Sequence, residues 1–246
     1  MESVVYGPHS VEVLLRTRAS DIAEMWVLES AAARVQTLAQ NARVAKIKVH
    51  TVARAALDEI AQGGRHQGVI VRLSQPSGVR NENALDELLD RVPEPFLLIL
   101  DGVQDPHNLG ACLRSADAAG VHAVIVPKDR AVGLTPTVRK VASGAAETVL
   151  LIQVTNLART LRHLKDHNIW IIGAAGEAKE SLYQVPLTGA LAIVMGAEGS
   201  GLRRLTAEHC DRLMHIPMAG MVDSLNVSVA TGVCLFEAVR QRNANT

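Results

Sequence analysis

The chain has 246 residues, of which 48% are hydrophobic and 20% charged, with 25 basic and 25 acidic side chains. This composition excludes the disordered class and is typical of one or two packed domains. The balanced charge also excludes a broad basic field, so any binding of RNA has to use a local patch and a shaped surface.

Nothing in the sequence predicts a membrane partner or secretion. The apolar runs are all shorter than the roughly 18 residues that a membrane span requires, and the N-terminus MESVVYGPHS lacks the basic flank and apolar core of a signal peptide. We therefore expect a cytoplasmic protein.

The first part of the chain predicts a small α/β domain over residues 1–74. Short runs rich in β-branched residues alternate with helical patterns: the runs lie at 24–29, 46–50 and 68–73, and the helices at about 8–17, 31–43 and 52–62. Residues 75–94 then change in character, with Pro, Gly, Ser and Asn followed by a short acidic segment. We interpret 75–94 as a linker between two domains.

The second domain is predicted over residues 95–246 and contains six apolar runs. These runs lie at 96–103, 122–129, 148–154, 169–176, 191–199 and 213–220, and helices follow at positions such as 108–120, 156–168 and 221–242. Strands that are apolar on both faces and alternate with helices predict a parallel sheet covered on both sides. Ligands of such sheets bind at the carboxyl ends of the strands.

The loop after the first of these strands, DGVQDPHN, leads into a helix that carries Arg114. Asn108 stands where a helix cap is expected. Arg114 lies among small residues, which indicates that another element or a ligand approaches this face of the helix closely. Two interpretations stay open at this point: Arg114 faces a ligand, or it is a surface residue beside a tightly packed helix.

The loop after the fifth strand, VMGAEGSGL, is rich in glycine and has Glu198 in its middle. It matches neither of the common phosphate-binding patterns, and its acid would repel phosphate. A simple glycine turn is one explanation. Further glycines follow the fourth and sixth strands, in IIGAAGE and IPMAG, so three such loops are expected to converge at one end of the sheet.

The last predicted helix opens with Ser224, Asn226 and Ser228 in a segment that otherwise appears buried. Asp223 or Ser224 is a competent N-cap, which explains one polar residue. The cap does not explain Asn226 and Ser228, whose polar side chains are not favoured in the first turn of a buried helix. We therefore predict that a ligand at this helix start accepts hydrogen bonds from them or donates hydrogen bonds to them. Ser228 is left as helix packing or a secondary contact.

Three segments carry a resemblance to a known family. DPHNLGACLRSADAAG, IVMGAEGSGL and IPMAGMVDSLNVSVATGVCLFEAVRQ resemble, in order and spacing, the signature motifs of the SpoU, or TrmH, family of RNA ribose 2′-O-methyltransferases. YGPHSVEVLL and HQGVIV resemble the N-terminal substrate-binding domain of members that act on 23S rRNA, a domain similar to ribosomal protein L30e. The resemblance covers the whole chain.

The resemblance implies a fold and an activity. The expected fold is a C-terminal SPOUT methyltransferase domain with a deep trefoil knot, an exception to the rule that chains avoid threading loops, together with a small L30e-like domain. The implied reaction methylates the ribose 2′-hydroxyl of a specific guanosine in 23S rRNA, in the P-loop of the peptidyl-transferase centre. The implied cofactor is S-adenosyl-L-methionine, bound in a bent form, and the implied partners are 23S rRNA or a large-subunit assembly intermediate, and a second copy in a homodimer.

The resemblance also implies site residues by position. The catalytic cluster would comprise Asn108, Arg114, Glu198, Ser224 and Asn226. The cofactor contacts would come from Gly173, Ala174, Gly176, Met195, Gly196, Ile216, Met218 and Leu225. Because a guanidinium has a pKa above about 12, we assign Arg114 to binding the adjacent phosphate and stabilising a developing alkoxide. Glu198 would orient Arg114 or the ribose, and Asn108 would shape the first loop.

Three other functions are alternatives to this one. A tRNA or antibiotic-resistance rRNA 2′-O-methyltransferase would use the same chemistry on another RNA, and a non-catalytic RNA-binding or ribosome assembly protein would keep the fold with an idle site. A dinucleotide-binding oxidoreductase would need a GxGxxG motif that the chain lacks. Neither the nine histidines nor the three cysteines show the spacing of metal ligands, so no metal is expected.

Overall fold

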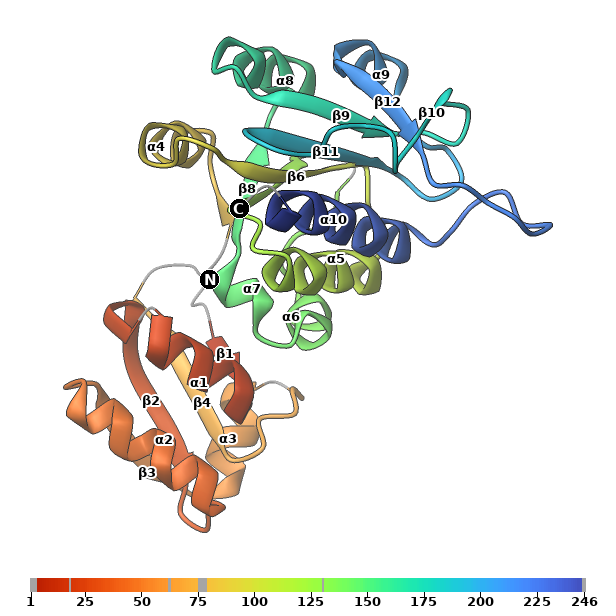
Figure 1. Ribbon diagram of the computed structural model, residues 1–246. Coiled ribbons are helices and arrows are strands. Elements are labelled where there is room, and N and C mark those ends of the chain that lie inside the picture. The colour runs from red at the N-terminus through yellow and green to blue at the C-terminus, as the bar shows by residue number, and fades with distance from the viewer. Residues whose placement is uncertain (1–3, 18, 62, 75–78, 130, 245–246) are drawn as a thin grey trace. The chain divides into compact units, whose positions relative to one another are not determined.

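The computed structural model (Figure 1) describes residues 4–17, 19–61, 63–74, 79–129 and 131–244. The chain divides into two compact units, Met1–Gly78 and Val79–Thr246. Within the part of the chain that is described, no helix combines the length and the apolar character that crossing a membrane requires.

The first unit is a four-stranded sheet with helices on both faces. Its elements are β1 (Val4–Tyr6), α1 (Pro8–Thr17), the 3₁₀ turn η1 (Ala19–Asp21), β2 (Ile22–Leu28), α2 (Ala33–Val44), β3 (Lys48–Val52), α3 (Arg54–Ala61) and β4 (Val69–Leu73). The strand order is β1-β4-β2-β3, with β2 and β3 parallel and β4 antiparallel to both of its neighbours. The three predicted strands and three predicted helices are all present, and β1 is an addition.

The second unit is built on an eight-stranded parallel sheet. Its strands are β5 (Val79–Arg80), β6 (Phe96–Asp101), β7 (Ala123–Pro127), β8 (Leu150–Val154), β9 (Trp170–Ala174), β10 (Glu180–Ser181), β11 (Leu191–Gly196) and β12 (Arg212–His215). Its helices are α4 (Asn83–Arg91), α5 (Pro106–Ala118), α6 (Pro136–Ala142), α7 (Ala145–Thr148), α8 (Leu157–Asp166), α9 (Arg204–His209) and α10 (Val227–Ala244). The six predicted strands correspond to β6, β7, β8, β9, β11 and β12.

Helices cover both faces of this sheet (Figure 1), as the apolar character of its strands predicts. On one face α5, α6, α7 and α10 enclose a core that includes Leu98 and Ile193. On the other face α4 and α8 enclose a second core that includes Ile99 and Val194. Adjacent residues of one strand therefore point into different cores, because side chains alternate across a strand.

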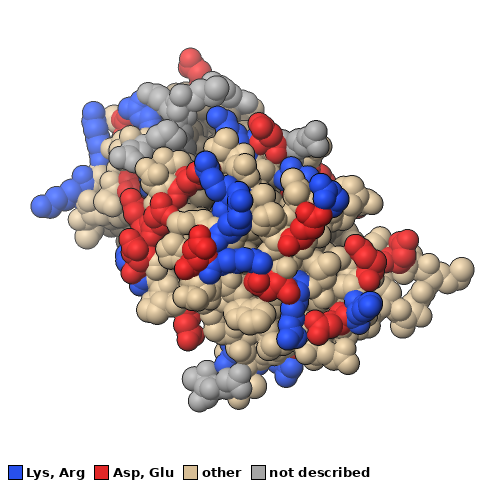
Figure 2. All heavy atoms as spheres, turned by 90° about the horizontal axis from the view of Figure 1, so that it is seen from above, with Lys and Arg blue, Asp and Glu red and all other residues tan. Residues whose placement is uncertain are grey.

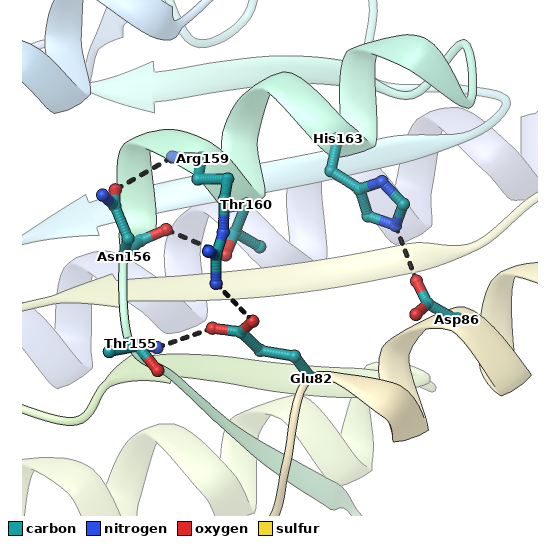
Figure 3. Close-up of polar contacts among 7 residues, drawn as sticks. All are labelled: Glu82, Asp86, Thr155, Asn156, Arg159, Thr160 and His163. Atoms are coloured by element: carbon teal, nitrogen blue, oxygen red, sulfur yellow. Dashed lines mark hydrogen bonds and ion pairs between the residues drawn. The ribbon is translucent and has the colours of Figure 1, made fainter.

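The predicted linker is wrong over most of its length. Residues 75–78 lie outside the described residues, but β5 pairs with β8 and α4 buries Leu85 and Leu88 in the second core. Figure 3 shows that acidic side chains of this segment bond to the region of α8: Glu82 accepts from Arg159 at 2.6 Å and Asp86 bonds to His163 at 2.7 Å. These acidic residues of the predicted linker therefore lie at the start and on the outer face of a helix that packs on this unit.

The strand order, β10-β12-β9-β11-β6-β7-β8-β5, does not follow the chain. β11 lies between β6 and β9, and Gly196 and Asp101 are register partners at their carboxyl ends. Because all these strands are parallel, the loops that follow β6, β9, β11 and β12 meet at one edge of the sheet. This confirms the predicted convergence of the glycine-bearing loops. On the face shown in Figure 2, Lys and Arg side chains alternate with Asp and Glu among the described residues.

Candidate active site

Three distant segments meet through a chain of side-chain hydrogen bonds. Asn226, before α10, donates from Nδ2 to Oδ1 of Asn108 on α5 at 3.0 Å. Asn108 donates in turn from Nδ2 to Oε2 of Glu198, in the turn after β11, at 3.1 Å. The amide of Asn108 thus accepts on one side and donates on the other. Three of the five residues predicted to form the catalytic cluster therefore contact one another.

The start of α5 differs from the prediction and explains why Asn108 is available. Asp105 is the N-cap, because its Oδ1 accepts from the backbone N–H of His107 at 2.9 Å, and Pro106 follows at the first helical position. Asn108 is therefore not the cap but the third helical residue, and it is buried. Its amide is free of the backbone and bonds to Glu198 and Asn226 instead.

The start of α10 also corrects a prediction. Asn226, rather than Asp223 or Ser224, caps this helix: its Oδ1 accepts from the backbone N–H of Ser228 at 2.9 Å and from the Ser228 hydroxyl at 2.6 Å. The predicted ligand is therefore not needed to explain why Asn226 and Ser228 are polar, because they bond to each other. Asn226 has two functions, because Oδ1 caps the helix while Nδ2 holds Asn108.

The turn that carries Glu198 is closed by its own backbone. Ala197 and Gly201 exchange two hydrogen bonds, at 3.1 and 2.9 Å, and Gly199 and Gly201 have φ values of +78° and +63°. A Cβ on Gly196 would lie 2.2 Å from the carbonyl carbon of Gly201. Glycine is required at these positions because the backbone is left-handed or too close to itself.

A hollow of about 350 Å³ opens beside the cluster. Its lining comes from the loop after β6, the start of α5, the turn after β11 and the start of α10: Asp101, Gly102, Val103, Gln104, Asp105, Asn108, Ala197, Glu198, Ser200, Gly201, Arg203 and Val227. Most of the polar side chains at its wall are acceptors or amides. The hollow therefore suits a ligand that donates hydrogen bonds, such as a sugar hydroxyl group.

Arg114 and Ser224 do not join this chain of hydrogen bonds. Arg114 is exposed on α5, and no contact among the described residues links its side chain to Asn108, Glu198 or Asn226. Its small neighbours serve helix packing: a Cβ on Gly110 would lie 2.7 Å from Cβ of Val141, just before α6 ends. Ser224 is also exposed, and its hydroxyl donates to Asp223 at 3.2 Å.

The predicted cofactor residues lie at the carboxyl ends of β9 and β11 and after β12. Ala174 and Met195 are register partners, and Ala175 donates its N–H to the carbonyl of Met214 at 2.9 Å. Ala174, Gly196, Ile216, Met218 and Leu225 are half-buried and Gly176 is exposed. These residues offer apolar side chains and glycine backbone at the strand ends, which is chemistry that suits the adenosyl group and the carbon chain of the implied cofactor.

Gly173 and Met195 differ from the other predicted cofactor residues because they are buried. Met195 belongs to the first core. A Cβ on Gly173 would lie 2.8 Å from each of three side chains, those of Cys210, Leu202 and Leu213. Gly173 is thus required for packing between β9 and the segment around α9, and neither residue presents a side chain to the loops.

The three cysteines are buried or half-buried. Burial raises the pKa of Cys112 to about 11 and the pKa values of Cys210 and Cys234 to about 12. Since the thiolate is the nucleophilic form, these groups are unreactive at neutral pH. No group of three or more His, Cys, Asp or Glu side chains arranged to hold a metal occurs among the described residues.

Asp101 and Arg203 also line the hollow, and the sequence analysis did not predict them as site residues. Asp101 ends the otherwise apolar strand FLLILD, and its side chain is fully buried against Arg203. The signal that could have found it is a single acid at the carboxyl end of a strand that is apolar on both faces, since such an acid is buried and needs a partner.

The comparisons with known proteins identify the family of both units. Residues 95–236 match the SpoU rRNA Methylase family, and residues 4–78 match the domain described as RNA 2'-O ribose methyltransferase substrate binding. The chain is 57% identical over 243 residues to the 23S rRNA (guanosine-2'-O-)-methyltransferase RlmB of Yersinia pestis, covering 98% of each chain. It is 57% identical over 244 residues to the protein of that name from Escherichia coli K12, covering 99% of this chain and all of the other.

A solved structure supports the fold. The SpoU methyltransferase AviRb from Streptomyces viridochromogenes superposes with a TM-score of 0.82 at 23% identity, over 99% of this chain and 91% of that one. The match of the second unit to the methylase family and of the first unit to the substrate-binding domain defines the class, a two-domain RNA methylase. The chain belongs to the SpoU rRNA methylase family.

Proposed function

We propose that this chain transfers a methyl group from S-adenosyl-L-methionine to the ribose 2′-hydroxyl of a specific guanosine in 23S rRNA. The relatives that carry this function in their names match it at 57% identity over nearly the whole chain. The structural observation that carries the proposal is the chain of hydrogen bonds from Asn226 through Asn108 to Glu198. It joins the three motif segments at the wall of one hollow.

The chain's own residues would hold the cofactor in the loops after β9, β11 and β12. Ala174, Gly176 and Gly196 would approach it by their backbones, and Ile216, Met218 and Leu225 would contact its apolar parts. When bound, S-adenosylmethionine supplies an electrophilic methyl group on a sulfonium. The protein then has to align the ribose oxygen with that methyl group and assist the loss of a proton.

The polar residues divide this work. Glu198 and Asn108 would orient the ribose, because both line the hollow. Arg114, exposed on α5, would bind the phosphate next to the target ribose and stabilise charge on its oxygen. Ser224 would contact the cofactor or ribose from the segment before α10. For Arg114 and Ser224 this requires bound RNA or a second copy of the chain to complete the site.

The proposal includes a homodimer and the trefoil knot of the family. Four large apolar side chains are exposed on α10 and the segment before it: Met221, Val222, Val229 and Phe236. Large apolar side chains that are exposed close together in the chain favour a covered interface. We expect a second copy to cover it, and the residues next to it include those of the proposed site.

The RNA would be 23S rRNA, either free or in a large-subunit assembly intermediate, and the reaction would take place in the cytoplasm. The first unit would bind this RNA, in line with its match to a substrate-binding domain. Because the chain carries no net charge at neutral pH, recognition would depend on the shape of the RNA more than on a long-range field.

The test is transfer of tritium from labelled S-adenosylmethionine to deproteinised 23S rRNA that lacks its methylations. Transfer RNA and 16S rRNA are the controls, and the modified nucleotide is mapped afterwards. We expect one 2′-O-methylguanosine in 23S rRNA. Incorporation into tRNA alone would overturn the target, and silence on free and assembling rRNA despite cofactor binding would overturn the enzymatic function.

A matched variant tests the role of Arg114. Arg114→Ala should abolish turnover while the affinity for S-adenosylmethionine, measured by calorimetry, stays close to that of the wild type. The physical reason is that Arg114 is proposed to stabilise charge on the reacting RNA and not to contact the cofactor. Substantial turnover by Arg114→Ala would remove Arg114 from the mechanism.

A further inference from the structure

Asp101 and Arg203 form an ion pair beside the Glu198 turn, in which the carboxylate is buried and the Arg203 side chain is 45% exposed. The side chain of Asp101 has no exposed surface. Its Oδ1 accepts from Nε of Arg203 at 2.6 Å and pairs with a terminal guanidinium nitrogen, while its Oδ2 accepts from the backbone N–H of Arg203 at 3.2 Å. Arg203 therefore holds both carboxylate oxygens, one with its guanidinium and one with its backbone.

The pair connects the two ends of the turn. Asp101 on β6 is the register partner of Gly196, the last residue of β11 before the turn. Arg203 is the last residue after the turn, before α9 begins. Between them lies the backbone pair of Ala197 and Gly201. The segment that carries Glu198 is thus fastened at its base to the strand that leads into α5 and Asn108.

This ion pair fixes the position of Arg203 relative to β6, because breaking it costs free energy. A fully buried carboxylate that loses its partner is left uncompensated, and the planar guanidinium holds it with defined direction. The neighbouring Arg204 differs in this respect. Its ion pair with Glu208 at 2.6 Å lies on the surface of α9, with the two side chains 79% and 50% exposed, and surface pairs of this kind constrain little.

We propose that Asp101 and Arg203 are positioning residues for methyl transfer, which hold the Glu198 turn at the distance where Glu198 meets Asn108. This role rests on the proposed function. The pair acts through Glu198, and it sets the position of the ribose that Glu198 orients. Both residues also line the hollow, so a displaced turn changes the shape of the space where the ribose would bind.

The test compares Arg203→Gln and Arg203→Lys with the control Arg204→Gln. We expect Arg203→Gln to lower kcat by about 100-fold, as misplacement of a reacting group by about 1 Å does, with the KM for RNA and the affinity for S-adenosylmethionine close to wild type. The kcat of Arg203→Lys should lie between those of Arg203→Gln and the wild type, because lysine keeps the positive charge but lacks the two-pronged guanidinium. Arg204→Gln should match the wild type.

A second readout does not depend on catalysis. Amide hydrogen exchange of Ala197 and Gly201, followed by NMR, should accelerate in Arg203→Gln and stay unchanged in Arg204→Gln. A third readout is the combination with Glu198→Gln. If the pair acts through Glu198, Arg203→Gln should add little loss of kcat to the Glu198→Gln variant, whereas independent sites would multiply their effects.

Stability is controlled with the double variant Asp101→Asn with Arg203→Gln, which removes both charges together and leaves no unpaired carboxylate. We expect it to fold, with fast exchange at Ala197 and Gly201 and low kcat. Wild-type exchange and kcat in the double variant would overturn the proposal, as would full multiplication of losses with Glu198→Gln. If the wild type methylates no RNA, the proposed function is wrong. The structural part of the inference is tested separately: wild-type amide exchange of Ala197 and Gly201 in Arg203→Gln would show that the ion pair does not hold the turn.

Discussion

At the scale of single residues, the site depends on side chains that use both ends of an amide. Asn226 caps α10 with Oδ1 and donates to Asn108 with Nδ2. Asn108 repeats this pattern between Asn226 and Glu198. Unlike the carboxylate of Asp, the amide of Asn carries both an acceptor and a donor on one short planar group. This explains why the two positions are asparagine and not the acids that also cap helices.

The two functions of Asn226 can be separated by substitution. Asn226→Asp keeps the oxygen that caps α10 but loses the donor to Asn108, so we expect a thermal stability close to wild type and a large loss of turnover. Asn226→Ala loses both, and the missing cap should cost about 1 kcal/mol of unfolding free energy in addition. Urea unfolding and the tritium assay measure the two effects. Full turnover by Asn226→Asp would show that the bond to Asn108 is dispensable.

At the scale of secondary-structure elements, α4 is held to the region of α8 by polar contacts that its sequence does not reveal. Glu82, just before α4, accepts from the backbone N–H of Thr155 at 2.8 Å and from the guanidinium of Arg159. Asp86 on α4 pairs with His163 on α8. Beneath these contacts Leu85 and Leu88 are buried. The short acidic segment is therefore a folded part of the second unit (Figure 3).

These contacts give the stability a defined pH dependence. The N–H of Thr155 and the Arg159 guanidinium hold the pKa of Glu82 below its usual value of 4.5. A carboxyl whose pKa is lowered by folding stabilises the protein above its unfolded pKa and loses this contribution as the pH falls through the folded pKa.

Glu82→Gln should therefore destabilise the protein at pH 7, by less than about 1 kcal/mol because the pair is partly exposed. The difference from wild type should shrink below pH 4.5. Urea unfolding at both pH values measures it, with the exposed Glu87→Gln on the same helix as the control. A difference that does not change with pH would contradict the role of the Glu82 charge.

At the scale of the whole molecule, the order of the strands assembles the site. β11 lies between β6 and β9, and β12 lies beside β9, so loops that are 90 and more residues apart in the chain share one edge. The family match begins at residue 95, but the compact unit begins at Val79. Between residues 79 and 94, Leu85 and Leu88 belong to the second core of this unit.

Truncation tests this boundary. A chain of residues 79–246 should fold and bind S-adenosylmethionine, while methylation of 23S rRNA falls sharply because the unit matched to substrate binding is missing. A chain of residues 95–246 should be less stable, because it loses Leu85 and Leu88 from the core, and each buried leucine contributes about 2 kcal/mol. Thermal unfolding followed by circular dichroism compares the two. Equal melting temperatures would contradict the assignment of β5 and α4 to this unit.

The sequence by itself determined the alternation of strands and helices in both units and the convergence of three loops, because apolar periodicity and glycine report local burial and turns. Its motifs also indicated the family. Only the tertiary structure decided that Asp105 and Asn226 cap α5 and α10, that 79–94 is folded, and that Arg203 holds Asp101. Each of these depends on which polar group lies opposite another, and that is set by packing between segments far apart in the chain and not by the pattern within either segment.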